Sequence, residues 1–224
     1  MRKLIGIGMI VILLAALTAC KEEESSGKES FAAPSVTPQT SEQDSATSQS
    51  LDQGKVLVAY FSWADNAVLA EDVDAVASPS VIPPGNVQQL AGWVQEETGG
   101  DLFSIRVTDP YPSDWDECLD RANQERGDDA RPDLDQYDTI FLGYPNWWYG
   151  VPMALLTFLE QNDLSGKQVY LFCSHGTGGL ARSVEIITEA APDAVISDNI
   201  FDCYEEEASS SQSDIRNWVA ELGY

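Results

Sequence analysis

From residue 55 onward, short apolar runs alternate with segments whose apolar residues recur at helical spacing. The run 55–60 is almost entirely apolar, which is typical of a strand covered on both faces. In 86–98, apolar side chains recur every three or four residues before Gly99, which predicts a helix that ends at the glycine. The same alternation continues along the chain. We expect strands at 55–60, 101–107, 139–144, 168–174 and 195–201, and helices at 86–98, 113–122, 152–161, 182–190 and 215–222.

Five predicted strands that alternate with five predicted helices indicate an α/β fold. The regular alternation favours three layers, with a doubly wound, five-stranded parallel sheet between two layers of helices. In such folds, ligands bind beyond the carboxyl ends of the strands, at the point where the strand order reverses. The loops after the first, third and fourth predicted strands are therefore the candidates for a binding site.

The first 53 residues follow a different pattern. Arg2 and Lys3 precede an uncharged apolar run at 4–17, and small residues then lead to Cys20. Because this run is shorter than the roughly 20 residues that cross a bilayer, we expect a signal peptide at 1–19 and lipid modification of Cys20. An ordinary secretory peptide with an incidental cysteine is the alternative.

The stretch 20–53 is rich in Ser, Thr, Glu and Gln, and it carries too few apolar side chains to form a core. We expect it to be a disordered linker between the lipid anchor and a single domain at 54–224. The domain would then lie on the extracytoplasmic face of the cell membrane and contact that membrane only through the anchor.

Charge narrows the range of partners. The chain has 12 basic and 37 acidic residues, and removal of the signal peptide takes away two of the basic ones. Nucleic-acid binding is excluded, because phosphate contacts require Lys and Arg. A protein partner is expected to be basic where it docks, although the acidity can also serve solubility alone.

The cysteines and the histidine narrow the range of chemistry. Beyond Cys20, the chain has Cys118, Cys173 and Cys203, an odd number, so at least one thiol is unpaired and no disulfide framework is expected. Their spacing matches neither a CxxC motif nor a zinc site, and we expect no metal. His175 is the single histidine.

The loop after the first predicted strand is interrupted. Ser62 and Trp63 are separated from Gly85, Asn86 and Val87 by an insert at 64–83. A glycine at a helix N-terminus lets backbone N–H groups surround a phosphate, although the same residues can be a simple turn and cap. The insert adds four acids that could repel a phosphate, namely Asp65, Glu71, Asp72 and Asp74.

The loop after the third predicted strand is aromatic. Pro145 and Asn146 are followed by Trp147, Trp148 and Tyr149. Aromatic side chains beyond a strand end form a flat apolar wall with polar edges, which suits a planar aromatic ring. Alternatively, these aromatic side chains fill the end of the sheet or form an interface with another protein.

The loop after the fourth predicted strand is rich in glycine. It reads Ser174, His175, Gly176, Thr177 and Gly178. Glycines let the backbone approach a ligand closely, and the two hydroxyls can bind polar ring edges. His175 could contact a ligand, protonate it, or simply face solvent or make a structural hydrogen bond.

Together the three loops resemble those of the flavodoxin-like family. That family has Ser-x-Thr-Gly-Asn-Thr in its first loop, and one branch has Gly-Tyr-Pro-x-Trp-Trp after the third strand, as in 143–148 here. The third loop of the family is commonly Thr-Ser-Gly-Gly. This chain departs from the pattern at the insert and at Val87, which stands where the family has a threonine.

The resemblance implies a strand order of 2-1-3-4-5 and one FMN bound without a covalent bond. The chain would act in electron transfer, or as an FMN-dependent reductase of quinones or flavins that uses NAD(P)H, with a redox partner protein or a small-molecule acceptor. A flavodoxin-like fold that has lost flavin and serves as a binding module is the alternative. The expected FMN residues are Ser62, Trp63, Gly85, Asn86, Val87, Pro145, Asn146, Trp147, Trp148, Tyr149, Ser174, His175, Gly176, Thr177 and Gly178.

Overall fold

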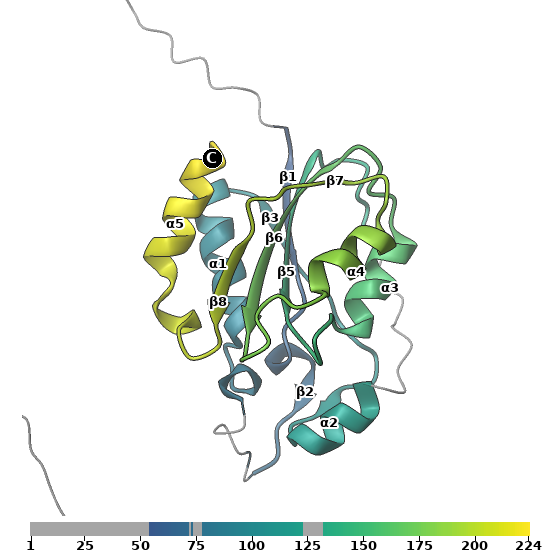
Figure 1. Cartoon of the computed structure of the whole chain (residues 1–224), viewed down its shortest axis with the longest axis vertical. Helices are drawn as coiled ribbons and strands as arrows, with labels where there is room; N and C mark the ends of the chain where they lie inside the picture. The colour runs from purple at the N-terminus through teal and green to yellow at the C-terminus, as the bar shows by residue number, and fades with distance from the viewer. Residues whose placement is uncertain (1–53, 72, 74–77, 123–131) are drawn as a thin grey trace, which may run out of the picture. The chain divides into compact units, whose positions relative to one another are not determined.

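The computed structural model describes residues 54–71, 73, 78–122 and 132–224 (Figure 1). The predicted signal peptide, the lipidated Cys20 and the whole of the predicted linker lie outside these residues and stay predictions. Within the described part of the chain, no helix has the length and apolar character needed to cross a membrane.

The main sheet is parallel throughout, and its order is the one predicted. The strands run β3-β1-β5-β6, and two short strands, β7 and β8, both pair with the outer edge of β6. All residues of β1 and β5 are buried, as expected for strands covered on both faces. The strands are β1 (Val56–Tyr60), β3 (Asp101–Ser104), β5 (Thr139–Pro145), β6 (Gln168–His175), β7 (Val195–Ile196) and β8 (Phe201–Tyr204).

The predicted fifth strand at 195–201 is divided in two, which corrects the sequence-based expectation. Val195 pairs with Gln168 and Phe201 pairs with Phe172, so the chain gains two residues relative to β6 between these pairs. Asn199 donates its backbone N–H to the Ser197 hydroxyl at 3.1 Å. A local turn of polar side chains thus replaces sheet hydrogen bonds between β7 and β8.

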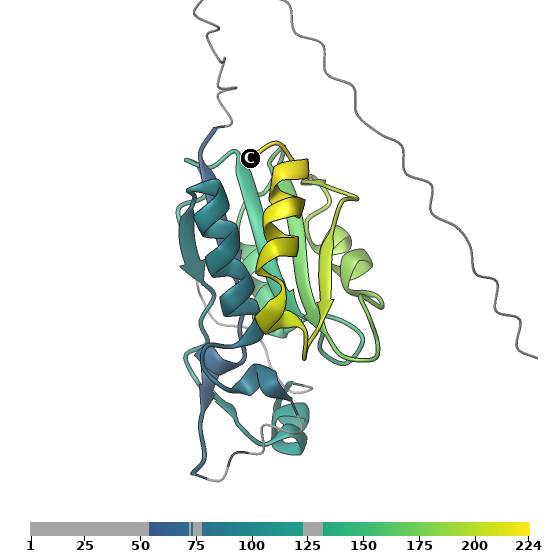
Figure 2. The same cartoon turned by 90° about the vertical axis from the view of Figure 1, so that its left-hand side faces the viewer.

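Helices cover both faces of the sheet, in three layers. α1 (Asn86–Thr98) and α5 (Gln212–Glu221) lie side by side on one face, and α3 (Met153–Gln161) and α4 (Ser183–Ala190) lie on the other (Figures 1 and 2). Side chains of β1 alternate between the two cores. Leu57 belongs to the core under α3, whereas Val58 belongs to the core under α1 and α5.

A smaller group of elements lies beyond the carboxyl ends of the strands. It contains α2 (Trp115–Ala122) and a second parallel sheet of β2 (Ala67–Val68) and β4 (Tyr111–Pro112), as Figure 1 shows. The insert also contributes two 3-10 helices, at Ala64–Asn66 and Pro79–Val81. The insert and α2 therefore stand at the end of the sheet where ligands bind in this class of fold.

Candidate functional site

A pocket of about 250 Å³ opens at the carboxyl ends of β5 and β6. The loops after these two strands form most of its wall, and a backbone hydrogen bond of 2.9 Å from Asn146 to Ser174 holds them together. Ten of the fifteen residues expected from the sequence line it. They are Pro145, Asn146, Trp147, Trp148, Tyr149, Ser174, His175, Gly176, Thr177 and Gly178.

Trp147 anchors the aromatic end of the pocket in the protein core. Its side chain is only 7% exposed, and its ring makes edge contacts with Phe61 at 5.4 Å and with Tyr111 at 5.2 Å. Trp63, which does not line the pocket, packs behind it at 6.0 Å and donates its indole N–H to the carbonyl of Pro112. The wall is therefore part of the hydrophobic core and is held rigid by it.

Trp148 and Tyr149 occupy a tight turn with unusual backbone angles. Trp147 and Gly150 exchange two backbone hydrogen bonds, and the two residues between them have φ values of 52° and 63°. Residues other than glycine and asparagine rarely adopt this left-handed backbone conformation, because it costs about 1–2 kcal/mol per residue. Strain of this size is typical of a functional loop, and here it presents two aromatic side chains to the pocket.

Tyr149 lies across the glycine loop. Its side chain is 68% exposed, and a Cβ atom on Gly178 would lie 3.1 Å from its ring. A larger residue at 178 would therefore push the ring away. The glycine keeps the two pocket loops in close contact, in addition to any contact that it makes with a ligand.

One buried donor at the pocket has no partner. The indole Nε1 of Trp148 is fully buried and finds no hydrogen-bond partner among the described residues. An unpaired buried N–H costs free energy, so a ligand acceptor that reached this group would gain a hydrogen bond. Trp115 of α2, which sequence reasoning missed, packs against the Trp148 ring at 4.6 Å and also lines the pocket.

His175 is held by two acceptors of this chain. Its Nε2 lies 2.7 Å from the Asp202 carboxylate, and its Nδ1 lies 2.9 Å from the carbonyl oxygen of Gly176. Of the three roles considered for it from the sequence, the structure shows the structural hydrogen bond. His175 thus fixes the glycine loop to β8 while it borders the pocket.

The polar end of the pocket contains three residues that sequence reasoning missed. Ser78 donates its hydroxyl to the Glu205 carboxylate at 2.7 Å, and Ser80 lies 2.6 Å from Ser78, oxygen to oxygen. The 3-10 helix of the insert places the two serines, and the loop after β8 places the glutamate. No local motif marks them, because they meet only through the tertiary fold.

The other five expected residues do not line the pocket. All five are buried: Ser62 and Trp63 follow β1, and Gly85, Asn86 and Val87 stand at the start of α1. A Cβ atom on Gly85 would collide with the Ser62 hydroxyl and lie 3.0 Å from the carbonyl oxygen of Ser80, which belongs to the insert. The insert therefore packs on the expected phosphate loop and covers it.

Asn86 nevertheless connects this covered loop to the pocket. Its side-chain amide donates to the Ser174 hydroxyl at 3.2 Å and to the carbonyl oxygen of Glu205 at 2.8 Å. The Ser62 hydroxyl is buried and has no partner among the described residues. The polar end of the pocket is thus adjacent to the N-terminus of α1, the end that favours anions.

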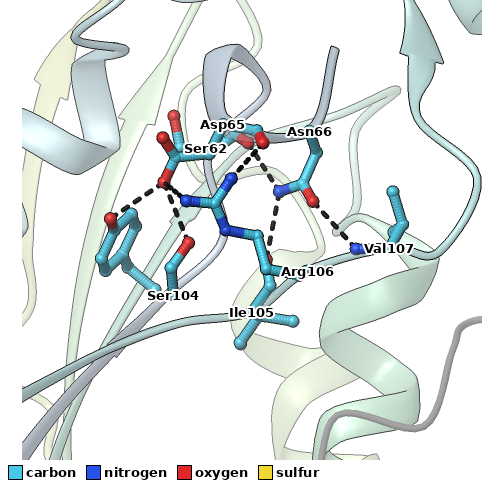
Figure 3. A network of polar contacts seen from close by, with 8 residues as sticks. Ser62, Asp65, Asn66, Ser104, Ile105, Arg106 and Val107 are labelled. Atoms are coloured by element: carbon cyan, nitrogen blue, oxygen red, sulfur yellow. Dashed lines mark hydrogen bonds and ion pairs between the residues drawn. The ribbon is translucent and has the colours of Figure 1, made fainter.

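Neither of the two described acids of the insert lines the pocket. Asp65 accepts hydrogen bonds from Tyr60 and Ser104, each at 2.9 Å, and pairs with Arg106 at 3.4 Å (Figure 3). Glu71 is exposed, and Asp72 and Asp74 lie outside the described residues. The carboxylate that borders the pocket is Glu205 instead.

The buried thiols are not poised as nucleophiles. None of the three cysteines in the described part of the chain forms a disulfide, and all three are buried. Burial raises the pKa of Cys173 well above its usual range and that of Cys203 to about 11, so both stay protonated at neutral pH. Among the residues that the structure describes, no group of three or more His, Cys, Asp or Glu side chains is placed to hold a metal ion.

The fold and the site together define a class of protein. A doubly wound parallel sheet carries, at its carboxyl end, a pocket with an aromatic wall, a glycine loop and an unpaired indole donor. This arrangement fits a planar ring system with acceptor atoms at its edge, as a flavin has.

Comparison with known proteins identifies the family. A family model for flavodoxin matches residues 75–222, more than half of the chain, so the chain belongs to the flavodoxin family, whose fold binds FMN. Flavodoxin 1 of Escherichia coli K12 is 28% identical over 92 residues, as is the flavodoxin of Haemophilus influenzae. Each match covers 39% of this chain and 42% of the relative, so the chain spans less than half the length of these relatives.

Solved structures support the fold. Two proteins described as candidate flavoproteins, from Bacteroides eggerthii and Bacteroides uniformis, each match with a TM-score of 0.56. They are 24% and 22% identical to this chain, and the matches cover 76% and 75% of it and nearly all of each neighbour. At this identity the likeness establishes the shared α/β architecture.

Proposed function

We propose that this protein binds FMN and acts in electron transfer or as an FMN-dependent oxidoreductase. The observation that carries the proposal is the aromatic pocket with its unpaired indole donor, Trp148 Nε1. Bound FMN would supply the exchange of one or two electrons between a donor and an acceptor. The protein would bind the cofactor, orient it and exclude water from it.

Each wall of the pocket has a part in this binding. Trp147 offers a fixed apolar surface, and Trp148 offers a hydrogen-bond donor. The Tyr149 side chain is largely exposed, so it can cover one side of a planar ring without any change in core packing. On the opposite loop, backbone groups of Gly176 and Gly178 and the Thr177 hydroxyl border the same space.

Flavin titration of the mature chain tests the proposal. We expect FMN fluorescence to be quenched on binding, and we expect Trp148→Phe to weaken binding about 5–10-fold through loss of one buried hydrogen bond. Trp93→Phe is the matched control, since Trp93 lies on α1 in the other core. Absence of binding at high micromolar FMN, with the chain folded, would disprove the function.

A flavodoxin-like binding module without flavin is the second candidate. It is favoured by one observation, namely that the insert covers the expected phosphate loop at Ser62, Gly85 and Asn86. The same titration separates the two candidates, because this module would leave FMN fluorescence unchanged.

A carrier and a reductase differ in whether they accept hydride from a nicotinamide. We propose that the electrons pass to a redox partner protein or to a small-molecule acceptor. Oxidation of NADH or NADPH by the FMN-loaded chain with a quinone acceptor would establish the reductase. A loaded chain that oxidises neither nicotinamide would be a carrier.

We propose, finally, that the domain is lipid-anchored through Cys20 on the extracytoplasmic face of the cell membrane. The support is the apolar run at 4–17 followed by small residues and a cysteine. Metabolic labelling with a fatty acid and cell fractionation test it. Cys20→Ala is expected to abolish labelling, and membrane lipidation that persists in this variant would refute the anchor.

A further inference from the structure

The described residues of the pocket wall include one carboxylate, that of Glu205 at the polar end, and no Lys or Arg. Among the described residues that line the pocket, the side chains able to carry a charge near neutral pH are those of Glu205 and His175, and the histidine is bound to the Asp202 carboxylate. A phosphate dianion that entered this end would therefore meet a carboxylate and no Lys or Arg from the lining.

The backbone of Glu205 is held in place by two hydrogen bonds. Its N–H donates to the carbonyl oxygen of His175 at 2.8 Å, and its own carbonyl oxygen accepts from Asn86 at 2.8 Å. The carboxylate extends from this anchor to the Ser78 hydroxyl. The Glu205 carboxylate therefore occupies the Ser78 hydroxyl, which is a hydrogen-bond donor in the pocket wall.

We propose that Glu205 determines which form of flavin the site accepts, because its carboxylate takes the place of the flavin phosphate. This inference rests on the proposed function. Serine hydroxyls are suitable phosphate donors, and here Ser78 already donates to the Glu205 carboxylate while Ser80 is hydrogen-bonded to Ser78. FMN must displace that carboxylate or bind beside it, whereas riboflavin, which has no phosphate, need not.

Like charges a few ångströms apart repel strongly even at an effective dielectric constant of about 20. The repulsion should cancel what the Ser78 and Ser80 hydroxyls offer to the phosphate. Wild-type protein is therefore expected to bind riboflavin and FMN with similar affinity. Neutralising Glu205 should leave riboflavin binding unchanged and tighten FMN binding.

Titration of the full mature chain with FMN and with riboflavin, each followed by flavin fluorescence, tests this. We expect the two dissociation constants to agree within about 3-fold in the wild type, and Glu205→Gln to tighten FMN at least about 10-fold relative to riboflavin. Glu206→Gln is the matched control, because Glu206 is the exposed neighbour, carries the same charge and does not line the pocket.

A double variant links the effect to the serine. Adding Ser78→Ala to Glu205→Gln should remove most of the gained preference for FMN, because the phosphate then loses its donor. Urea unfolding of each variant verifies that the fold is retained. The glutamine side chain can still accept the Ser78 hydrogen bond, so we expect no loss of stability in the single variant.

The outcomes separate this inference from the proposed function. If both flavins bind and Glu205→Gln leaves their ratio unchanged, the role of Glu205 is refuted while the flavin site stands. A wild type that already prefers FMN by about 100-fold refutes it as well. If neither flavin binds to the folded wild type or to the variant, the proposed function itself fails and the inference fails with it.

Discussion

The two ends of the pocket are held in place by different forces. At the aromatic end, Trp147 is embedded among Phe61 and Tyr111, so the surface offered to a ligand is one side of the protein core. At the polar end, Ser78 and Ser80 belong to the insert at 64–83. Asn66 of this insert donates hydrogen bonds to the carbonyl oxygens of Ser62 and Ile105, which follow β1 and β3 (Figure 3). Packing holds one end, and a polar network holds the other.

This difference affects how each end can change. A core-anchored wall transmits any loss of volume to the whole fold, because interiors are close-packed. A segment held by hydrogen bonds can be rebuilt locally, provided that each buried polar group keeps a partner. The aromatic end is therefore expected to keep its shape across variants, and the polar end is where specificity can be altered.

The largest effect is expected from Trp147→Ala. Removal of a 7% exposed indole leaves a cavity among aromatic rings and should lower the free energy of unfolding by about 3–5 kcal/mol. Urea unfolding of the mature chain measures this. The matched control is Tyr149→Ala in the same loop, whose side chain is 68% exposed and should cost less than about 1 kcal/mol. Equal losses in the two variants would contradict the core-anchored wall.

A smaller loss is expected from Asn66→Ala at the polar end. Its side-chain amide donates to the carbonyl oxygens of Ser62 and Ile105, at 2.9 and 3.1 Å, and its Oδ1 accepts from the N–H of Val107 at 2.9 Å. Leaving these buried groups unpaired should lower the free energy of unfolding by about 2–3 kcal/mol. A loss under about 0.5 kcal/mol in urea unfolding would show that the network does not hold the insert.

The sequence predicted the sheet and the four helices that cover its faces because their signals are local. A continuous apolar run such as 55–60 can form little else than a buried strand, and the helical spacing at 86–98 matches α1 to the residue. The break between β7 and β8 was missed because its cause is a polar turn around Asn199. Its side chains differ little in pattern from those of an exposed edge strand.

The candidate site, too, was predictable from the sequence only where its signals are local. Residues 145–149 and 174–178 line the pocket because each group directly follows a strand, so their sequence position determines their place. Ser78, Ser80, Trp115 and Glu205 were missed, since an insert, a helix and a distant loop bring them there. Gly85 was expected to wrap a phosphate, and the structure shows it packed against the insert.

Tyr149→Gly should separate stability from binding at the aromatic end. Glycine relieves the left-handed strain at φ 63° and loses little buried area, so stability should stay the same or rise by about 0.5–1 kcal/mol. Flavin binding should weaken at the same time, because the covering ring is lost. Urea unfolding and FMN titration of one preparation measure both. A variant that binds FMN as the wild type does would remove Tyr149 from the site.

The smallest effect concerns the buried thiol two residues before Glu205. Burial and, to a smaller extent, the nearby carboxylates of Asp202, Glu207 and Asp214 raise the pKa of Cys203 from its ordinary value of 9.0 to about 11. The unfolded chain loses this proton near pH 9 and the folded chain keeps it until about pH 11. Its contribution to stability is therefore complete below pH 9 and is lost as the pH rises towards 11.

Cys203→Ala removes this titration. The tyrosines that also titrate at high pH are present in both proteins, so the difference in unfolding free energy between wild type and variant reports the thiol alone. The stability advantage of the wild type over the variant should shrink between pH 8 and pH 10 by about 1 kcal/mol. Urea unfolding at both pH values measures it. An advantage that stays constant would mean that the thiol is as accessible to water in the folded chain as in the unfolded one. Water would then reach the polar end of the pocket next to Glu205. That water would screen the repulsion between the Glu205 carboxylate and an incoming phosphate.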